Sequence, residues 1–156
     1  MIELFSRRPD YLTMIETRLT PVHVSEDTVS LSAILLDDEY YDLLKQGAVE
    51  VEGVSVLDLE YLVLFKMKAW LDLSARKAKG EHVDSKNIKK HRNDVLRLAA
   101  NIDPDARLDI DGAVLQDVME FIDQNKDDGI DVKTLGIRGA RYEDLIDRLK
   151  NCYHNQ

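Results

Sequence analysis

The stretch that decides the fold is LDLEYLVLFKMKAWLDLSARKA, residues 57–78. Its apolar side chains recur every three or four positions, which is the spacing of one face of an α-helix. The stretch therefore predicts one long helix, and the Lys-Gly-Glu-His sequence at 79–82 ends it. Projection onto a helix gathers one apolar arc: Leu59, Leu62, Val63, Met67, Ala69, Trp70 and Leu73.

Lys66 lies in the middle of this arc. Burial of an unpaired ammonium group is unfavourable by several kcal/mol. The side chain must therefore extend along its methylene groups into solvent, pair with an internal acid, or meet an anionic ligand. Lys68 falls on the opposite face, where we expect it to face solvent and to pair with Asp72 four residues on.

Three more helices are predicted downstream of this one. The first runs from Asp84 or Ser85, either of which suits the N-cap, to about residue 100. Its inner face includes Asp84, Asn87 and His91, and a core hydrogen bond is the simplest role for the histidine. The others cover residues 112–125 and a final stretch that ends near residue 153. Their apolar stripes consist of Val114, Val118, Phe121 and Ile122, and of Tyr142, Leu145, Ile146, Leu149 and Tyr153.

Upstream of the long helix, short apolar runs predict strands. They cover residues 2–5, 22–24 and 30–36, and residues 11–19 suit a short helix or an irregular segment. A helix capped by Asp37 or Asp38 ends at Gly47, and Glu52-Gly53 joins strands 48–51 and 54–56 in a hairpin. The sequence thus predicts an α+β fold: a small mixed sheet in residues 1–56, followed by a bundle of four to five helices in residues 57–156 that packs on it as a single unit.

Composition excludes several classes of function. The 156 residues carry a net charge of −9, which disfavours a general nucleic-acid or anionic-membrane binder. Residues 76–97 nevertheless hold eight basic and three acidic side chains, a pattern compatible with a phosphate-bearing ligand or with a solvated helix face. No apolar run reaches the ~18 residues of a membrane span. The single cysteine, Cys152, cannot form an internal disulfide, and we expect a cytoplasmic protein.

Metal-binding patterns do not emerge from the sequence. Asp109 to Gly112 resembles a calcium loop, but Arg107 and Val118 would occupy two of its ligand positions. The four histidines lack metal-ligand spacing. We therefore predict no metal site formed by this chain alone.

Four blocks of the chain resemble a known family. Residues 1–10 (MIELFSRRPD), 31–38 (LSAILLDD), 60–73 (EYLVLFKMKAWLDL) and 83–94 (VDSKNIKKHRND) are similar to consecutive blocks of bacterial nucleotidyltransferase-like proteins. These proteins form the AbiEii/AbiGii toxin group of the polymerase-beta-type nucleotidyltransferase superfamily. The resemblance covers essentially the whole chain, in order, and matches the C-terminal portion of such proteins.

The resemblance implies roles for four residues. Glu3 matches the third acid of the family's metal site, and Lys66 matches a helix lysine that faces the nucleoside triphosphate. Asp84 matches the first position of an Asp-x-x-Asp-like element, whose second position is Asn87 here. The family's Gly-Ser pair and the Asp-x-Asp that follows it have no counterpart, so magnesium is expected only together with the family's N-terminal half.

Two functions follow as expectations. The first is a truncated nucleotidyltransferase-like protein that is catalytically inert alone and binds a nucleoside triphosphate weakly. The alternative is a non-enzymatic interaction or oligomerisation module, related to toxin–antitoxin or abortive-infection systems. Such a module would pair with a partner protein or with a second copy through the edge strand at residues 2–5. A nucleic-acid reader is disfavoured, because the basic segment lacks interleaved aromatic residues.

Overall fold

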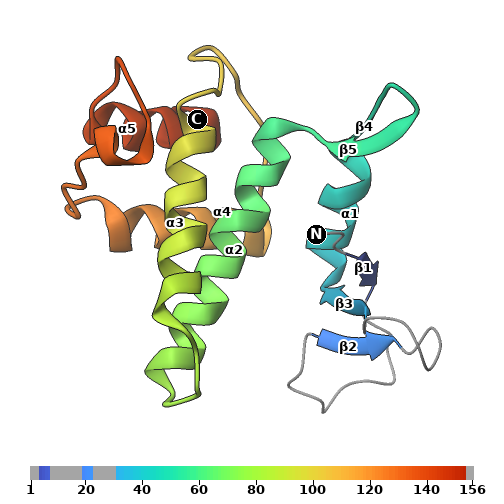
Figure 1. Cartoon of the computed structure of the whole chain (residues 1–156). Coiled ribbons are helices and arrows are strands. Elements are labelled where there is room, and N and C mark those ends of the chain that lie inside the picture. The colour runs from blue at the N-terminus through green and yellow to red at the C-terminus, as the bar shows by residue number, and fades with distance from the viewer. Residues whose placement is uncertain (1–3, 8–18, 23–30, 154–156) are drawn as a thin grey trace. The chain divides into compact units, whose positions relative to one another are not determined.

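The computed structural model describes residues 4–7, 19–22 and 31–153 of the chain, with side chains from residue 37 onward. The chain forms two compact units, residues 1–46 and residues 47–156. The first holds a small mixed sheet and one helix, and the second holds a hairpin and a group of helices (Figure 1). The predicted α+β class, with a small sheet followed by a helical bundle, is confirmed.

The sheet of the first unit contains three described strands, β1 (Leu4–Arg7), β2 (Leu19–Val22) and β3 (Leu31–Leu36). Their order is β1-β3-β2, so the longest strand is central. β1 runs parallel to β3, with Phe5 beside Ile34, and β2 runs antiparallel to it, with Thr20 beside Ala33. The mixed character of the sheet agrees with the prediction.

Two strand boundaries differ from those predicted. The first described strand begins at Leu4 and continues to Arg7, two residues beyond the predicted end, and residues 1–3 lie outside the described part. The strand expected at 22–24 lies at Leu19–Val22 and includes Pro21. Proline is tolerated there because β2 is at the edge of the described sheet, where a missing N–H need not interrupt a ladder. Most of the segment predicted at 11–19 lies outside the described residues.

Helix α1 (Asp38–Gln46) begins with the predicted cap, since the Asp37 carboxylate accepts a hydrogen bond from the Tyr40 amide at 3.1 Å. It ends before Gly47, as expected. Gly47 does not adopt a positive φ, however. A Cβ atom at this position would lie 2.3 Å from Cγ of Tyr61. The glycine therefore permits a close approach to the Tyr61 ring, and it does not provide a left-handed cap.

The second unit begins with the predicted hairpin of β4 (Ala48–Val51) and β5 (Val54–Leu57). Glu52 and Gly53 at its tip have φ values of 51° and 79°, the positive sign that a type I′ turn requires at both positions. The Asp58 amide donates to the Gly47 carbonyl at 2.8 Å, so the strands remain paired to their base. This bond and the Gly47–Tyr61 contact join the hairpin to the helices, and the second unit begins at Gly47.

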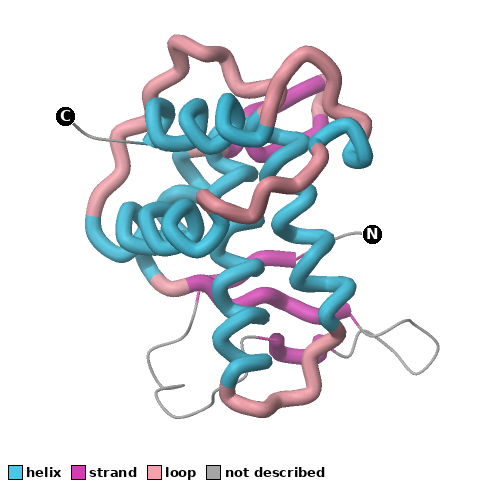
Figure 2. Tube along the Cα trace, turned by 90° about the vertical axis from the view of Figure 1, so that its left-hand side faces the viewer, coloured by secondary structure: helices cyan, strands magenta, loops and turns pink. Residues whose placement is uncertain are grey.

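Helices α2 (Leu59–Ala78) and α3 (Ser85–Ala99) form an antiparallel pair (Figures 1 and 2). α2 starts later than predicted because Leu57 belongs to β5 and Asp58 is the N-cap, accepting from the Leu59 amide at 2.8 Å. α4 (Gly112–Asn125), the 3₁₀-helix η1 (Val132–Leu135) and α5 (Tyr142–Tyr153) follow. α2 packs on α3 and α4, and α5 packs on the same two helices. The predicted apolar stripes of α4 and α5 are buried, which confirms both.

None of the described helices combines the length and the apolarity needed to cross a lipid bilayer.

Candidate functional site

The buried face of α2 differs from the predicted apolar arc. Its fully buried members are Val63, Leu64, Phe65, Met67, Trp70 and Leu71. Leu59, Leu62, Ala69 and Leu73, the other members of the predicted arc, are only half-buried. The prediction was wrong on this point because α2 packs on two neighbours, α3 and α4, and they bury a face centred nearer Met67 than Leu59.

Lys66 therefore lies at the margin of the buried face. Its side chain is half-buried, flanked on the helix surface by Leu62, Ala69 and Leu73. Its ammonium group makes no ion pair or hydrogen bond with any residue that the structure describes. Half-exposed apolar groups around an unpaired cation form a surface that can receive an anionic ligand with an apolar part.

Lys68 behaves differently from the prediction. It does not face open solvent, because its ammonium group lies 2.6 Å from a carboxylate oxygen of Asp117 on α4, and the two side chains are 19% and 17% exposed. The pair joins α2 to α4 at a partly buried position, where opposite charges attract more strongly than in water. The Lys68–Asp117 ion pair holds the two helices together. Lys66, two residues earlier on α2, forms no ion pair with the described residues.

Asp84 is the N-cap of α3. Its carboxylate accepts a hydrogen bond from the Lys86 amide at 2.8 Å, and both Asp84 and Asn87 are exposed. Lys66 precedes the last residue of α2, Ala78, by twelve positions, or ~18 Å along the helix at 1.5 Å per residue. The antiparallel arrangement therefore places Asp84 and Asn87 near the far end of the pair, and they do not converge with Lys66 on one site.

Glu3 lies outside the described residues. Within the described ranges no group of three or more His, Cys, Asp and Glu side chains is placed to hold a metal ion.

Half of the basic side chains between residues 76 and 97 are paired within the structure. Arg76 lies 2.6 Å from Glu81, and Lys77 donates to the Ser85 hydroxyl. Arg92 pairs with Asp128, and Arg97 contacts both Asp94 and the Leu135 carbonyl. The other four, Lys79, Lys86, Lys89 and Lys90, are exposed. A solvated helix face with internal ion pairs accounts for this segment.

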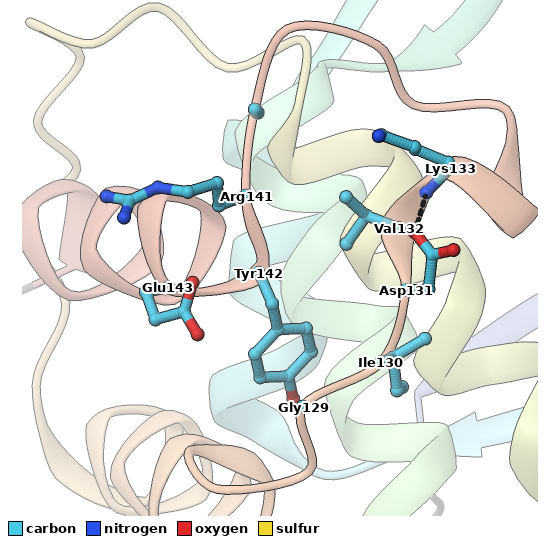
Figure 3. Close-up of a pocket in the computed structure, with 9 residues that line it drawn as sticks. Gly129, Ile130, Asp131, Val132, Lys133, Arg141, Tyr142 and Glu143 are labelled. Atoms are coloured by element: carbon cyan, nitrogen blue, oxygen red, sulfur yellow. Dashed lines mark hydrogen bonds between the residues drawn. The ribbon is translucent and has the colours of Figure 1, made fainter.

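A shallow pocket of about 210 Å³ lies between the loop at residues 129–133 and the start of α5 (Figure 3). Asp131 caps η1 by accepting from the Lys133 amide at 3.1 Å. Burial raises the pKa of Tyr142 to about 12, and its hydroxyl donates to the Asn125 carbonyl. Arg141 donates three hydrogen bonds to the Asp144 carboxylate, one from its backbone amide and two from its guanidinium group, and they hold the pKa of that carboxyl below its usual value. The polar groups that line this pocket form hydrogen bonds within the chain, which favours a structural role for the pocket residues.

An apolar groove of about 260 Å³ lies between α4 and α5. Its lining consists of Val118, Met119, Ile122, Lys150, Asn151 and Tyr153. Met119 is 50% exposed, whereas Tyr153 is buried and its hydroxyl donates to the Glu60 carbonyl at 2.6 Å. The sequence reasoning missed this groove and the pocket beside α5, because both are made by segments that meet only in the folded chain.

Cys152 is buried in α5, and burial raises the pKa of its thiol to about 11 from 9.0. The thiol therefore keeps its proton in the folded state up to high pH. We expect iodoacetamide at pH 8 to alkylate the folded chain much more slowly than the denatured chain, because burial raises the pKa of the Cys152 thiol and so lowers its thiolate fraction. Mass spectrometry of timed samples measures both rates. Equal rates would instead indicate an accessible, ionised thiol.

Comparison with family models, with curated proteins and with solved structures finds no match to this chain.

Proposed function

We propose that this chain is the C-terminal portion of a nucleotidyltransferase-like protein of the AbiEii/AbiGii group, inert in nucleotidyl transfer alone, which binds a nucleoside triphosphate weakly. The four blocks that resemble the family support this proposal, as does the α+β arrangement of a small mixed sheet followed by helices. The observation that carries it is Lys66, half-buried among apolar side chains and unpaired within the described residues.

The Lys66 ammonium group supplies a charge for the phosphates, and the neighbouring leucines supply apolar surface for the nucleoside. A lysine bound to internal acids, like Lys68, would have to break an ion pair before it met a ligand. Lys66 has no such pair to break among the described residues. Asp84 and Asn87 contribute little, because they follow the C-terminal end of α2, which lies ~18 Å from Lys66 along that helix.

Replacement of Lys66 by methionine should weaken binding of a fluorescent ATP analogue by about tenfold or more, since a hydrogen bond to a charged group contributes about 1.5–3 kcal/mol. Titration with magnesium present measures the dissociation constant. The matched control is Lys86→Met, at an exposed lysine in the first turn of α3. Fluorescence of the single tryptophan, Trp70, reports whether each variant is folded.

Equal binding of the ATP analogue by the Lys66→Met and Lys86→Met variants would contradict the role of Lys66.

The chain should not catalyse nucleotidyl transfer. Incubation with labelled ATP, CTP, GTP or UTP, magnesium and tRNA or protein acceptors should give no transfer of label. If label is transferred and the Glu3→Gln variant loses that transfer, the chain is not catalytically inert and Glu3 belongs to a working metal site.

A second function, as a non-enzymatic interaction module, is favoured by strand edges that have no partner within the described part of the chain. In the described part of the sheet β1 pairs with β3 on one side only. The β4–β5 hairpin also leaves four valines exposed. Exposed apolar side chains beside unpaired strand edges are typical of surfaces that pair with another chain.

A further inference from the structure

We infer that the outer edge of β4 binds an extended segment of a partner protein, in which apolar side chains alternate with lysine or arginine. This inference rests on the second proposed function and is independent of nucleotide binding. It follows from the apolar face of the hairpin, its acidic charge and the backbone groups along its edge.

The hairpin has one apolar face. Val49 lies opposite Val56 and Val51 lies opposite Val54, so all four side chains point to the same side of the two-stranded ribbon. Val49 and Val56 are each 40% exposed, Val51 is 53% exposed and Val54 is 60% exposed. A row of β-branched side chains on one face is the surface that a third strand of alternating pattern would extend.

The other face is acidic along β4. Glu50 lies on it opposite Ser55, Glu52 follows at the tip, and residues 48–58 contain no lysine or arginine. Edge strands are usually protected against pairing by lysine, proline or a bulge, and β4 (Ala48–Val51) has no lysine or proline. A partner strand with basic residues at alternate positions would place them beside Glu50, where opposite charges across strands are favourable.

The backbone of β4 is available for this pairing. The hydrogen bond from the Asp58 amide to the Gly47 carbonyl identifies Gly47 and Asp58 as a bonded pair. Bonded and non-bonded pairs alternate in an antiparallel ladder, so the N–H and C=O groups of Ala48 and Glu50 point away from β5. In the described part of the chain neither strand of the hairpin pairs with a third.

A partner strand fits this edge better than a second copy of the chain. Antiparallel pairing of two β4 strands centred on Glu50 would set Glu50 opposite Glu50, and like charges in that position are destabilising. Face-to-face packing of two hairpins would bury only four valines from each copy, far less than the ~800 Å² per partner of a standard interface. A basic strand adds main-chain hydrogen bonds and ion pairs to the same apolar contact.

Two series of seven-residue peptides with blocked ends test the inference. Both series carry valine or threonine at the odd positions. The even positions are lysine in one series and glutamate in the other. Fluorescence anisotropy with the full chain should show binding of the lysine series and not of the glutamate series. Glu50→Lys should weaken binding of the lysine series by about tenfold and favour the glutamate series. Met119→Lys, which replaces an exposed apolar residue on α4, is the matched control and should bind as the unmodified chain does.

Methylation of alternate peptide amides should abolish binding, because a methylated nitrogen cannot donate to the edge. Binding that survives methylation, or that Glu50→Lys leaves unchanged, would overturn the inference. Analytical ultracentrifugation can also overturn the inference. If the unmodified chain is a stable dimer and the Val51→Lys variant is a monomer, the valine face of the hairpin binds a second copy of the chain and not a partner peptide. Lys66→Met should bind the peptides unchanged, so failure of this inference and failure of nucleotide binding are distinguishable.

Discussion

Replacement of Phe121 by alanine should lower the free energy of unfolding of the second unit by about 3–5 kcal/mol, the usual cost of removing a buried aromatic ring. Phe121 is fully buried on α4, and its ring lies 5.2 Å from that of Trp70 on α2, at an angle of 80°. This edge-to-face pair contributes beyond the buried area alone. The substitution removes the ring and leaves a cavity between the two helices.

Urea unfolding followed by Trp70 fluorescence measures this effect directly, because the chain has one tryptophan and it contacts the altered site. Met119→Ala is the matched control, since Met119 lies on the same helix and is 50% exposed. We expect it to change stability by no more than about 0.5 kcal/mol. A loss for Phe121→Ala as small as that of the control would contradict the packing of α4 on α2.

Replacement of Arg148 by methionine should lower the free energy of unfolding by about 2–3 kcal/mol, because three carbonyl groups lose a charged donor. The Arg148 guanidinium on α5 donates to the carbonyls of Ala99, Ala100 and Ile102 at 3.4, 3.0 and 3.3 Å. Ala99 is the last residue of α3, Ala100 is its C-cap and Ile102 lies two residues further on, and the Ala99 carbonyl also accepts from the Ile102 amide at 3.3 Å. A cation beside the C-terminus of a helix also interacts favourably with the helix dipole.

The same urea titration tests Arg148→Met, and Arg138→Met is its control, because Arg138 is an exposed arginine in a nearby loop. The methionine keeps the apolar stem of the side chain, so the difference between the two variants isolates the hydrogen bonds and the charge. Equal stabilities would show that solvent satisfies the end of α3 without Arg148.

The successful sequence predictions concern local structure. The hairpin follows from Glu52-Gly53 between valine-rich runs, and α4 and α5 follow from stripes whose members are all buried. The predicted caps Asp37 and Asp84 precede their helices by one position. Each of these signals involves residues a few positions apart, so the chain carries it before any tertiary contact forms.

The candidate site could be predicted only in part. Lys66 was identified from the period of α2, but its place at the margin of the buried face depends on α4 as well as α3. The sequence placed Lys68 in solvent, whereas Asp117, 49 residues away, pairs with it. The position of Asp84 relative to Lys66 depends on how far the antiparallel helices α2 and α3 run past each other, which no local pattern specifies.

The order of helices and strands was thus encoded locally, in period, caps and turns, and the amino-acid sequence alone determined it. Tertiary structure decided which charges are committed and which are available: Lys68 to Asp117, Arg148 to the end of α3, and Lys66 to none of the described residues. The physical reason is that the energy of a charge depends on its surroundings, and residues far apart in the chain supply them.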